Sequence, residues 1–203
     1  PPSPAPPEPQ APPAAQGPDE AEIRARIQTA LTAFRSREQT EESDNAEVAL
    51  AALGKPAVPL IAAEIPAQAA GPAVHLVRAL ALIGGAEALS ALTDQLSGAQ
   101  AEVRAAAATA LAALGARDAA KPLAALLKDA DWTVRRAAAA AVTALGIKAA
   151  VPDLVALLAD PNLLVRSQAL ESLKQLTGQD LGHEPLPWKA WIEANPDALK
   201  DAP

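Results

Sequence analysis

The chain lacks several residue types on which catalytic and metal sites depend. Its 203 residues include no cysteine, no methionine, no tyrosine and only two histidines, His75 and His183. The absence of cysteine excludes a thiolate nucleophile, although it fits a reducing and an oxidising compartment equally well. Two histidines far apart in the sequence offer few metal ligands. We therefore expect that the chain is not an enzyme and has no cofactor or metal.

Positive charge and long apolar runs are also scarce. The chain has 17 lysines and arginines against 24 aspartates and glutamates, a net charge of −7, which argues against binding the phosphate backbone of a nucleic acid. No apolar run approaches the ~18 residues of a membrane-spanning helix. Aromatic residues make up 2% of the chain and apolar residues 50%. We therefore expect one domain built from alanine and leucine, with its stability spread along its length.

What the chain does contain is an internal repeat. The dipeptide Val-Arg recurs every 31 residues, at Val103-Arg104, Val134-Arg135 and Val165-Arg166. Glycine recurs almost in step, at Gly54, Gly84, Gly115, Gly146 and Gly178. A period between twenty and fifty residues is typical of a solenoid, in which each unit buries its apolar face against its neighbours. The sequence therefore predicts an all-α solenoid of about four to five stacked helix pairs.

Two helical patterns flank each glycine of the repeat. Apolar residues recur every three or four positions both before and after it, which is the helical period. The most regular column before the glycines consists of Leu50, Leu80, Leu111, Val142 and Leu173. Glycine just past a helix end favours helix closure, and Pro122 and Pro152 suit the first turn of the next helix. Each unit is therefore expected to be a helix pair.

Polar residues between the units are placed to cap the first helices. Asp131 and Asn162, again 31 residues apart, precede first helices and can accept hydrogen bonds from their unpaired N–H groups. Asp44 with Glu47 resembles a capping box. The sequence thus predicts where these helices begin.

Both ends of the chain depart from the repeat. Nine of the first twenty residues are proline, so residues 1–19 are expected to form a disordered Pro/Ala-rich tether, on the order of 60 Å long when extended. Residues 20–39 are expected to form an N-terminal capping helix, residues 40–178 the repeats, and residues 179–203 a C-terminal cap and tail. There Trp188 and Trp191 are expected to form a lid over the last repeat, with a ligand platform as the alternative.

The repeated units resemble a known family. Their form is Val-Arg-x-x-Ala-x-x-Ala-Leu-x-x-Leu-Gly followed by Ala-x-Pro-x-Leu-x-x-Leu-Leu, as in the bacterial HEAT-like repeats that share their pattern with the phycobilin-lyase HEAT-like family. The resemblance covers roughly residues 40–178 and is clearest over 101–176. It implies a solenoid of helix pairs. The first full unit departs from the pattern, because Pro72-Ala73 stands in place of Val-Arg, and a regular helix start is not expected there.

The resemblance also raises and excludes particular activities. A di-iron hydroxylase of the HEAT-like class needs several His-Glu pairs, whereas this sequence has only His183-Glu184, so the ligand count excludes that class. The phycobilin-lyase branch implies a small-molecule or chromophore-handling protein, which is the alternative function. The Trp-x-x-Trp segment at the C-terminal end resembles the end of many exported bacterial HEAT-repeat proteins.

If the chain binds a partner, we expect the concave face of the solenoid to do so, lined by the second helix of each unit. The candidate residues for binding a protein partner there are Glu87, Asp94, Lys121, Lys128 and Asp153. This mixture of signs suits a protein surface better than a polyanion. Trp132 is a further candidate anchor, because it stands at the very start of a helix where full burial is difficult. The alternative is that Trp132 packs on the turn at Pro161.

The repeated arginines are expected to be structural. Arg104, Arg135 and Arg166 occupy equivalent positions, and Asp129 and Asp160 lie in the turns between units. They are expected to form a ladder of exposed ion pairs, each contributing about 0 to 1 kcal/mol. Repeated between neighbours, such pairs would fix the angle at which the units stack.

These features together predict a non-catalytic scaffold or adaptor that binds a protein partner, as a subunit of or accessory to a bacterial envelope assembly. The chain begins at Pro1 rather than at methionine, so we expect a processed product. Either a signal peptide has been removed or the N-terminus carries a lipid anchor upstream of Pro1, which would place the protein in the periplasm or at the outer membrane. A cytoplasmic location is the alternative.

Overall fold

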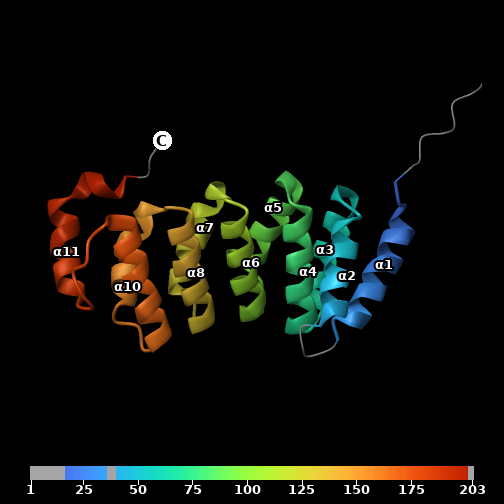
Figure 1. Cartoon of the computed structure of the whole chain (residues 1–203), viewed down its shortest axis with the longest axis horizontal. Helices are drawn as coiled ribbons and strands as arrows, with labels where there is room; N and C mark the ends of the chain where they lie inside the picture. Colours follow the sequence, from blue (N-terminus) through green and yellow to red (C-terminus); the bar gives the residue numbers. More distant parts are fainter. Residues whose placement is uncertain (1–16, 36–39, 201–203) are drawn as a thin grey trace, which may run out of the picture.

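The computed structural model describes residues 17–35 and 40–200, in which all regular structure is helical. The α-helices of this part stack side by side into an elongated solenoid (Figure 1), which confirms the predicted fold class. They are α1 (Glu20–Ala33), α2 (Glu41–Ala51), α3 (Val58–Glu64), α4 (Ala70–Ile83), α5 (Gly85–Gln95), α6 (Ala101–Ala113), α7 (Ala120–Ala125), α8 (Trp132–Ala144), α9 (Val151–Leu157), α10 (Leu163–Thr177) and α11 (Pro185–Ala194).

The repeat helices form two rows (Figure 1). The first row consists of α2, α4, α6, α8 and α10, and the second of α3, α5, α7 and α9, with α11 packed beside α9. Single 3-10 turns lead into three second-row helices, at Lys55–Ala57, Arg117–Ala119 and Lys148–Ala150. Neighbouring first-row helices pack closely against one another, whereas α5, α7 and α9 have few contacts among themselves. The first-row helices therefore pack more closely on one another than the second-row helices do.

Buried alanine explains the close packing of the first row. Ala107, Ala138 and Ala169 occupy equivalent positions on α6, α8 and α10, and all three are fully buried. Because a methyl group is the whole side chain, the helix backbones can approach closely there. Where Ser172 replaces alanine in the next column, its hydroxyl donates a hydrogen bond of 3.2 Å to the carbonyl of Ala139, so the polar group is satisfied across the interface.

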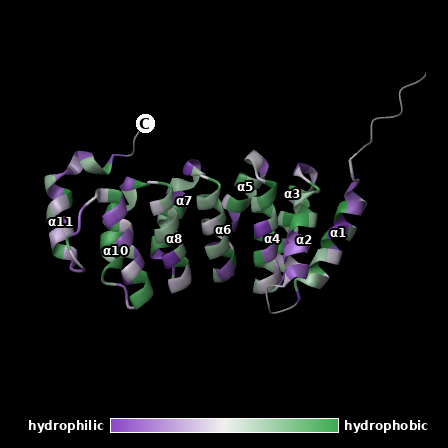
Figure 2. Ribbon diagram, viewed as in Figure 1, coloured by the Kyte–Doolittle hydropathy of each residue, from purple (hydrophilic) through white to green (hydrophobic). Residues whose placement is uncertain are grey.

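The predicted leucine column forms the centre of the core. Its five members, Leu50, Leu80, Leu111, Val142 and Leu173, are all buried. Figure 2 shows hydrophobic residues distributed along the whole stack rather than gathered at its centre. This distribution is the one expected of a solenoid, in which each unit is stabilised by its neighbours.

The helix ends follow the predicted turn chemistry in most places. All five glycines of the repeat have φ between +64° and +72°, the left-handed region that favours glycine. Helix α4 begins regularly at Ala70, so the irregular start expected from Pro72 is wrong. Pro72 lies in the first turn, where a helix does not need the missing N–H group.

The predicted caps are partly correct. Asp131 accepts a hydrogen bond of 2.7 Å from the N–H of Thr133, and Asn162 caps α10 in the same way. The capping box expected at Asp44 and Glu47 is wrong, because α2 begins earlier, at Glu41, with a reciprocal box between Thr40 and Ser43. Glu47 therefore lies inside the helix and is available for another role.

Both ends of the described stack are covered. At the N-terminal end α1 packs against α2 and buries Ile23, Ile27 and Leu31. At the C-terminal end Trp188 is fully buried and its Nε1–H donates to the carbonyl of Gly182 at 2.8 Å, which is the arrangement of a lid. The predicted tether falls almost entirely on residues 1–16, outside the described residues, and stays a prediction.

Within residues 17–35 and 40–200, no single helix is both long and apolar enough to cross a bilayer. In the same part of the chain, α2 and the segment Lys55–Ala67 reach that length and hydropathy together, but as a pair bent by 105°.

Candidate functional site

A buried polar cluster joins the N-terminal cap to the first two repeats. The carboxylate of Glu47 on α2 accepts a hydrogen bond of 2.5 Å from Nδ1 of His75 on α4. The imidazole stacks on the ring of Phe34, which follows α1, with 4.6 Å between ring centres and 9° between planes. All three side chains are buried. One imidazole therefore connects the cap helix α1 with the first two helices of the first row, α2 and α4.

A third polar side chain completes this cluster. Nη1 of Arg78, on α4, lies 3.6 Å from the same Glu47 oxygen that His75 contacts. The buried carboxylate thus faces two nitrogen groups, which offset the cost of removing it from water. His75 is therefore a core residue of this first junction. In the part of the chain that the structure describes, no three His, Asp or Glu side chains are grouped so as to hold a metal ion.

The sequence does carry a signal for this cluster. In the repeat frame Glu47 occupies the column whose other members are Val77, Ala108, Ala139 and Leu170, all apolar and buried. A single acid in a buried apolar column needs a partner. That exception, rather than a motif, identifies Glu47 as unusual.

An apolar groove of about 490 Å³ opens beside the cluster. It runs between α4 and α6, and its lining includes Glu47, Arg78, Leu82, Thr109 and Leu114. The alanines of α6 leave room between the two helices because their side chains are short. Leu82 is 56% exposed, which is unusual for a large apolar residue at the edge of a groove.

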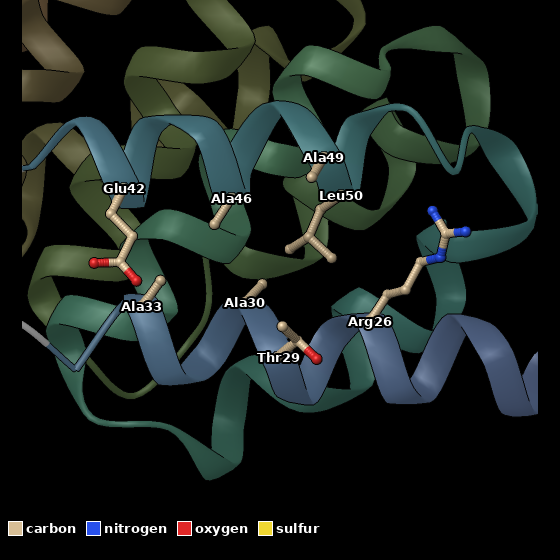
Figure 3. A pocket seen from close by; sticks show the side chains of 8 residues that line it. All are labelled: Arg26, Thr29, Ala30, Ala33, Glu42, Ala46, Ala49 and Leu50. Carbon is tan, nitrogen blue, oxygen red and sulfur yellow. The ribbon is translucent and has the colours of Figure 1, made fainter.

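A second groove, of about 410 Å³, lies between α1 and α2 (Figure 3). Arg26 stands at one end and Glu42 at the other, with Ala30, Ala46 and Leu50 between them (Figure 3). On the same row, Val48 is 61% exposed and takes on α2 the repeat position that Arg78 takes on α4. We call the surface formed by Val48, Leu82, Leu114 and these two grooves the first-row face.

The structure places the charged residues predicted to bind a partner on the second-row helices and their ends. Glu87, Asp94, Lys121 and Lys128 are exposed, and Asp153 is half-buried. Two ion pairs link neighbouring repeats on this surface. Nζ of Lys128 lies 2.9 Å from Asp153, and Nζ of Lys55 lies 3.8 Å from Glu87. Three of the five predicted charges are therefore occupied within the molecule, and their role in binding stays a prediction.

Trp132 lies apart from both grooves. It begins α8, is 37% exposed, and lines a shallow hollow of about 350 Å³ together with Pro161 and Asn162. The tryptophan thus borders the turn at Pro161 and also presents part of its ring to solvent. Both readings of this residue were stated from the sequence, and the geometry accommodates both.

The arginine ladder exists, with two complete rungs. Nε and Nη2 of Arg104 donate to Asp129 at 2.8 and 2.7 Å, and the same atoms of Arg135 donate to Asp160 at 2.7 and 3.0 Å. Nη1 of each arginine donates to two carbonyls of the preceding turn. These pairs were expected to be exposed, but they are largely buried, because the turn folds over them.

The ladder perturbs the acidity of its carboxyl groups. Burial by itself would raise the pKa of Asp160, but the hydrogen bonds from Arg135 and from the N–H of Asn162 outweigh it and hold the pKa below its ordinary value of 3.8. The pKa of Asp129 is lowered by the same balance, with Arg104 and the N–H of Asp131 as donors. Both carboxyl groups are therefore ionised partners at neutral pH.

Comparison with known families agrees with the repeat frame. The HEAT-repeat family model matches residues 72–142 and 121–182, together more than half of the chain. No curated protein sequence is significantly similar to the chain.

Several solved structures are similar to this chain in shape. The complex of CpcE and CpcF of phycocyanin lyase from Nostoc sp. PCC7120 contains a chain with 26% identity and a TM-score of 0.58, covering 73% of this chain and 98% of that one. Human deoxyhypusine hydroxylase has 22% identity and a TM-score of 0.52, covering 78% and 65%. An engineered protein has 20% identity and a TM-score of 0.50, covering 85% and 84%. At their identities, the latter two show likeness of fold alone.

These likenesses correct one expectation and settle the family. The prediction that the chain is not an enzyme is contradicted, because the matched Nostoc chain is part of a lyase and nearly all of it is covered. The absence of cysteine excludes one nucleophile, but it does not exclude chemistry by an acid and imidazole pair such as Glu47 and His75. Its repeats, their period and the matched family model show that the chain belongs to the HEAT-repeat family.

Proposed function

We propose that this HEAT-repeat protein binds another protein through its first-row face. The observation that carries the proposal is the exposure of Val48, Leu82 and Leu114 on that face, beside two apolar grooves. Contiguous apolar surface on a folded chain commonly marks an interaction site. The Nostoc relative was solved as a complex of two different proteins, which supports association as the use of such a surface.

The closer packing of the first-row helices on one another also supports this face. A stack of helix pairs bends toward the row whose members lie closer together, so we expect the first row to line the inner surface. The sequence predicts that the second-row helices line the inner, concave surface. We propose instead that the first-row helices line it. Concave surfaces of solenoids are extended binding surfaces.

The proposal is tested by placing a charge in the groove. Leu82→Asp should abolish recovery of a stoichiometric protein partner when the tagged chain is captured from its native cells after mild cross-linking. The matched control is Leu186→Asp, because Leu186 is 76% exposed on α11, away from the groove. Circular dichroism should show both variants folded, since both positions are on the surface.

Three outcomes separate the surfaces. Loss with Leu82→Asp and retention with Leu186→Asp supports the first-row face. If Leu82→Asp still recovers the partner and charge reversal at Asp94 and Lys121 abolishes its recovery, the binding site lies on the second-row helices. Recovery of the chain alone in every case would contradict stable protein binding.

A second candidate is action on a small molecule, as in the phycobilin-lyase branch. It is favoured by the likeness to the Nostoc lyase chain and by the Glu47–His75 pair beside a groove of about 490 Å³. Titration of a phycobilin with the chain should then give a saturable change in visible absorbance that Arg78→Ala and Leu82→Asp reduce. An absorbance change that both variants leave intact would place any binding elsewhere.

The cellular location stays a proposal as well. An envelope location rests on the proline-rich residues 1–19, most of which lie outside the described residues. Fractionation of native cells, followed by mass spectrometry of the N-terminal peptide, distinguishes a periplasmic, a lipid-anchored and a cytoplasmic form.

A further inference from the structure

The arginine ladder has three arginines but only two acids. Arg166 takes the same position on α10 that Arg135 takes on α8, and its Nη1 likewise donates to two carbonyls of the preceding turn, those of Asp160 and Pro161, at 2.7 and 3.1 Å. The acid that would complete this rung should stand 31 residues after Asp160. That position is Trp191.

The guanidinium of Arg166 therefore has an unfilled fork, by which we mean the pair of N–H donors at Nε and Nη2 without a bound carboxylate. In the two complete rungs Nε and Nη2 hold a carboxylate bidentately, whereas within residues 17–35 and 40–200 these two atoms of Arg166 have no hydrogen-bond partner and no paired acid. The side chain is half-buried and already oriented through Nη1. A planar, pre-oriented guanidinium is the preferred partner of a carboxylate.

Exposed apolar side chains precede Arg166 on the same helix. Leu163 and Leu164, in the first turn of the same helix, are 64% and 49% exposed. Leu163 lies three residues before Arg166 and so on the same side of α10. One repeat earlier, Trp132 lines the hollow between the turns. A charged anchor beside exposed apolar groups is the composition of a protein-binding site rather than of a site for a free ion.

We propose that Arg166 binds a carboxylate of a partner protein, on an acidic side chain flanked by apolar residues. The chain itself supplies the pattern for such a ligand. The segment Leu126-Leu127-Lys128-Asp129-Ala130 presents Asp129 to the equivalent fork of Arg104. This site lies at the start of α10, apart from the first-row face, so it is independent of the function proposed above.

Nuclear magnetic resonance of the full chain tests the proposal. The probe is the peptide acetyl-Leu-Leu-Lys-Asp-Ala-amide, added to ¹⁵N-labelled protein while the Nε–Hε signals of the arginines are followed. The signal of Arg166 should move saturably, and those of Arg104 and Arg135 should stay in place because their forks are filled. A peptide with asparagine in place of the aspartate should bind about tenfold more weakly, since it loses a charge-assisted hydrogen-bond pair.

Control measurements distinguish a partner carboxylate from other possible ligands of Arg166. Arg136 is exposed, and a movement of its signal equal to that of Arg166 would show nonspecific attraction and overturn the proposal. A stronger response of Arg166 to inorganic phosphate than to acetate, at equal ionic strength, would make the fork a phosphate site and overturn the carboxylate. A shift that depends on protein concentration without peptide would identify a second copy as the occupant, which also overturns it. Arg166→Lys, which keeps the charge without the fork, should lose the preference for the aspartate peptide.

Discussion

The first junction of the stack and the three regular repeats solve the same packing problem differently. Between α6, α8 and α10 the interface is alanine, and the charges stand at the edge, where Arg104 and Arg135 hold the turns. Between α2 and α4 the polar groups are inside, as Glu47 and His75, and Phe34 of the cap stacks on the imidazole. The repeat pattern thus supplies the interface in one region, whereas specific polar contacts supply it in the other.

The difference shows what a repeat does for stability. Each regular unit finds in its neighbour a surface of the same form, so nonspecific apolar packing with an edge ladder is enough to set the register. The cap helix α1 has no repeat to match, and the stacking of Phe34 on the imidazole of His75, which itself pairs with Glu47 between α2 and α4, fixes where it packs. The following predictions test this division, beginning with the largest expected effect.

Removing the imidazole should have the largest effect. His75→Ala leaves the Glu47 carboxylate buried and removes the ring that stacks on Phe34. Breaking a buried pair from one side costs about 3–5 kcal/mol. The free energy of unfolding, measured with urea, should fall by this order. The double variant Glu47→Ala/His75→Ala installs the alanines that α6 and α8 carry at these positions and should lose less than the single variant.

The double variant decides between two explanations of the junction. If it is as unstable as His75→Ala, the loss of stability comes from the lost packing around Phe34 as well as from the unpaired carboxylate. The polar pair then does more than align the helices. If it recovers stability, apolar packing of the regular kind suffices at the first junction too.

Opening one rung of the ladder should have a smaller effect. Arg135→Ala removes the bidentate contact to Asp160 and two hydrogen bonds to the turn. The expected loss is about 1–3 kcal/mol, together with a broader unfolding transition, because this rung couples neighbouring repeats. Equal slopes for the variant and the parent chain in urea would show that the rung stabilises without coupling. A variant that unfolds normally but loses its partner would make Arg135 a binding residue.

Acid should remove the ladder without mutation. The pKa values of Asp129 and Asp160 are lower in the folded chain than their ordinary value of 3.8. Their contribution to stability is therefore fully present above about pH 4 and is lost as the pH falls through the folded pKa values. Urea midpoints from pH 7 down to pH 2 should show this loss, and Asp160→Asn should flatten it. An unchanged acid profile in that variant would assign the loss to other carboxyl groups.

Glycine substitutions should give the smallest changes in stability, and the two variants below should change it in opposite directions. Gly178 has φ +72°, so Gly178→Ala should cost about 1 kcal/mol although its Cβ would meet no atom within 4 Å. Gly71 lies within α4, and a Cβ there also meets nothing within 4 Å. Gly71→Ala should stabilise the chain by about 0.5 kcal/mol. Thermal melts of the two variants should move in opposite directions.

Much of the fold could be predicted because the repeat supplies it several times. The helix pairs, the leucine column, the glycine closures and the caps at Asp131 and Asn162 follow from patterns that recur at one period, so each unit checks the others. The errors fall where the repeat is interrupted. The missing Val-Arg pattern at Pro72 predicts an irregular start, although a first turn accepts proline. The pair Asp44 and Glu47 predicts a capping box, although Thr40 is the residue that caps the helix.

The candidate site could be predicted only in part, for a related physical reason. The exposure of Leu82 and the burial of His75 depend on which helices pack against each other in the stack. The sequence pattern of one helix does not contain that information. The partners of Lys128 and Glu87 come from neighbouring units, so these residues looked available from the sequence. Glu47 alone carried a readable sign, as the acid in an apolar column.

The near absence of aromatic residues has an optical consequence. All three tryptophans, Trp132, Trp188 and Trp191, lie in α8 and α11, the chain has no tyrosine, and Phe34 is its only phenylalanine. Intrinsic fluorescence therefore reports on the C-terminal half of the stack and is silent about the Glu47–His75 junction, whereas far-ultraviolet circular dichroism reports on all helices. Two unfolding curves recorded by these signals on one sample would reveal, from their separation alone, which end of the solenoid opens first.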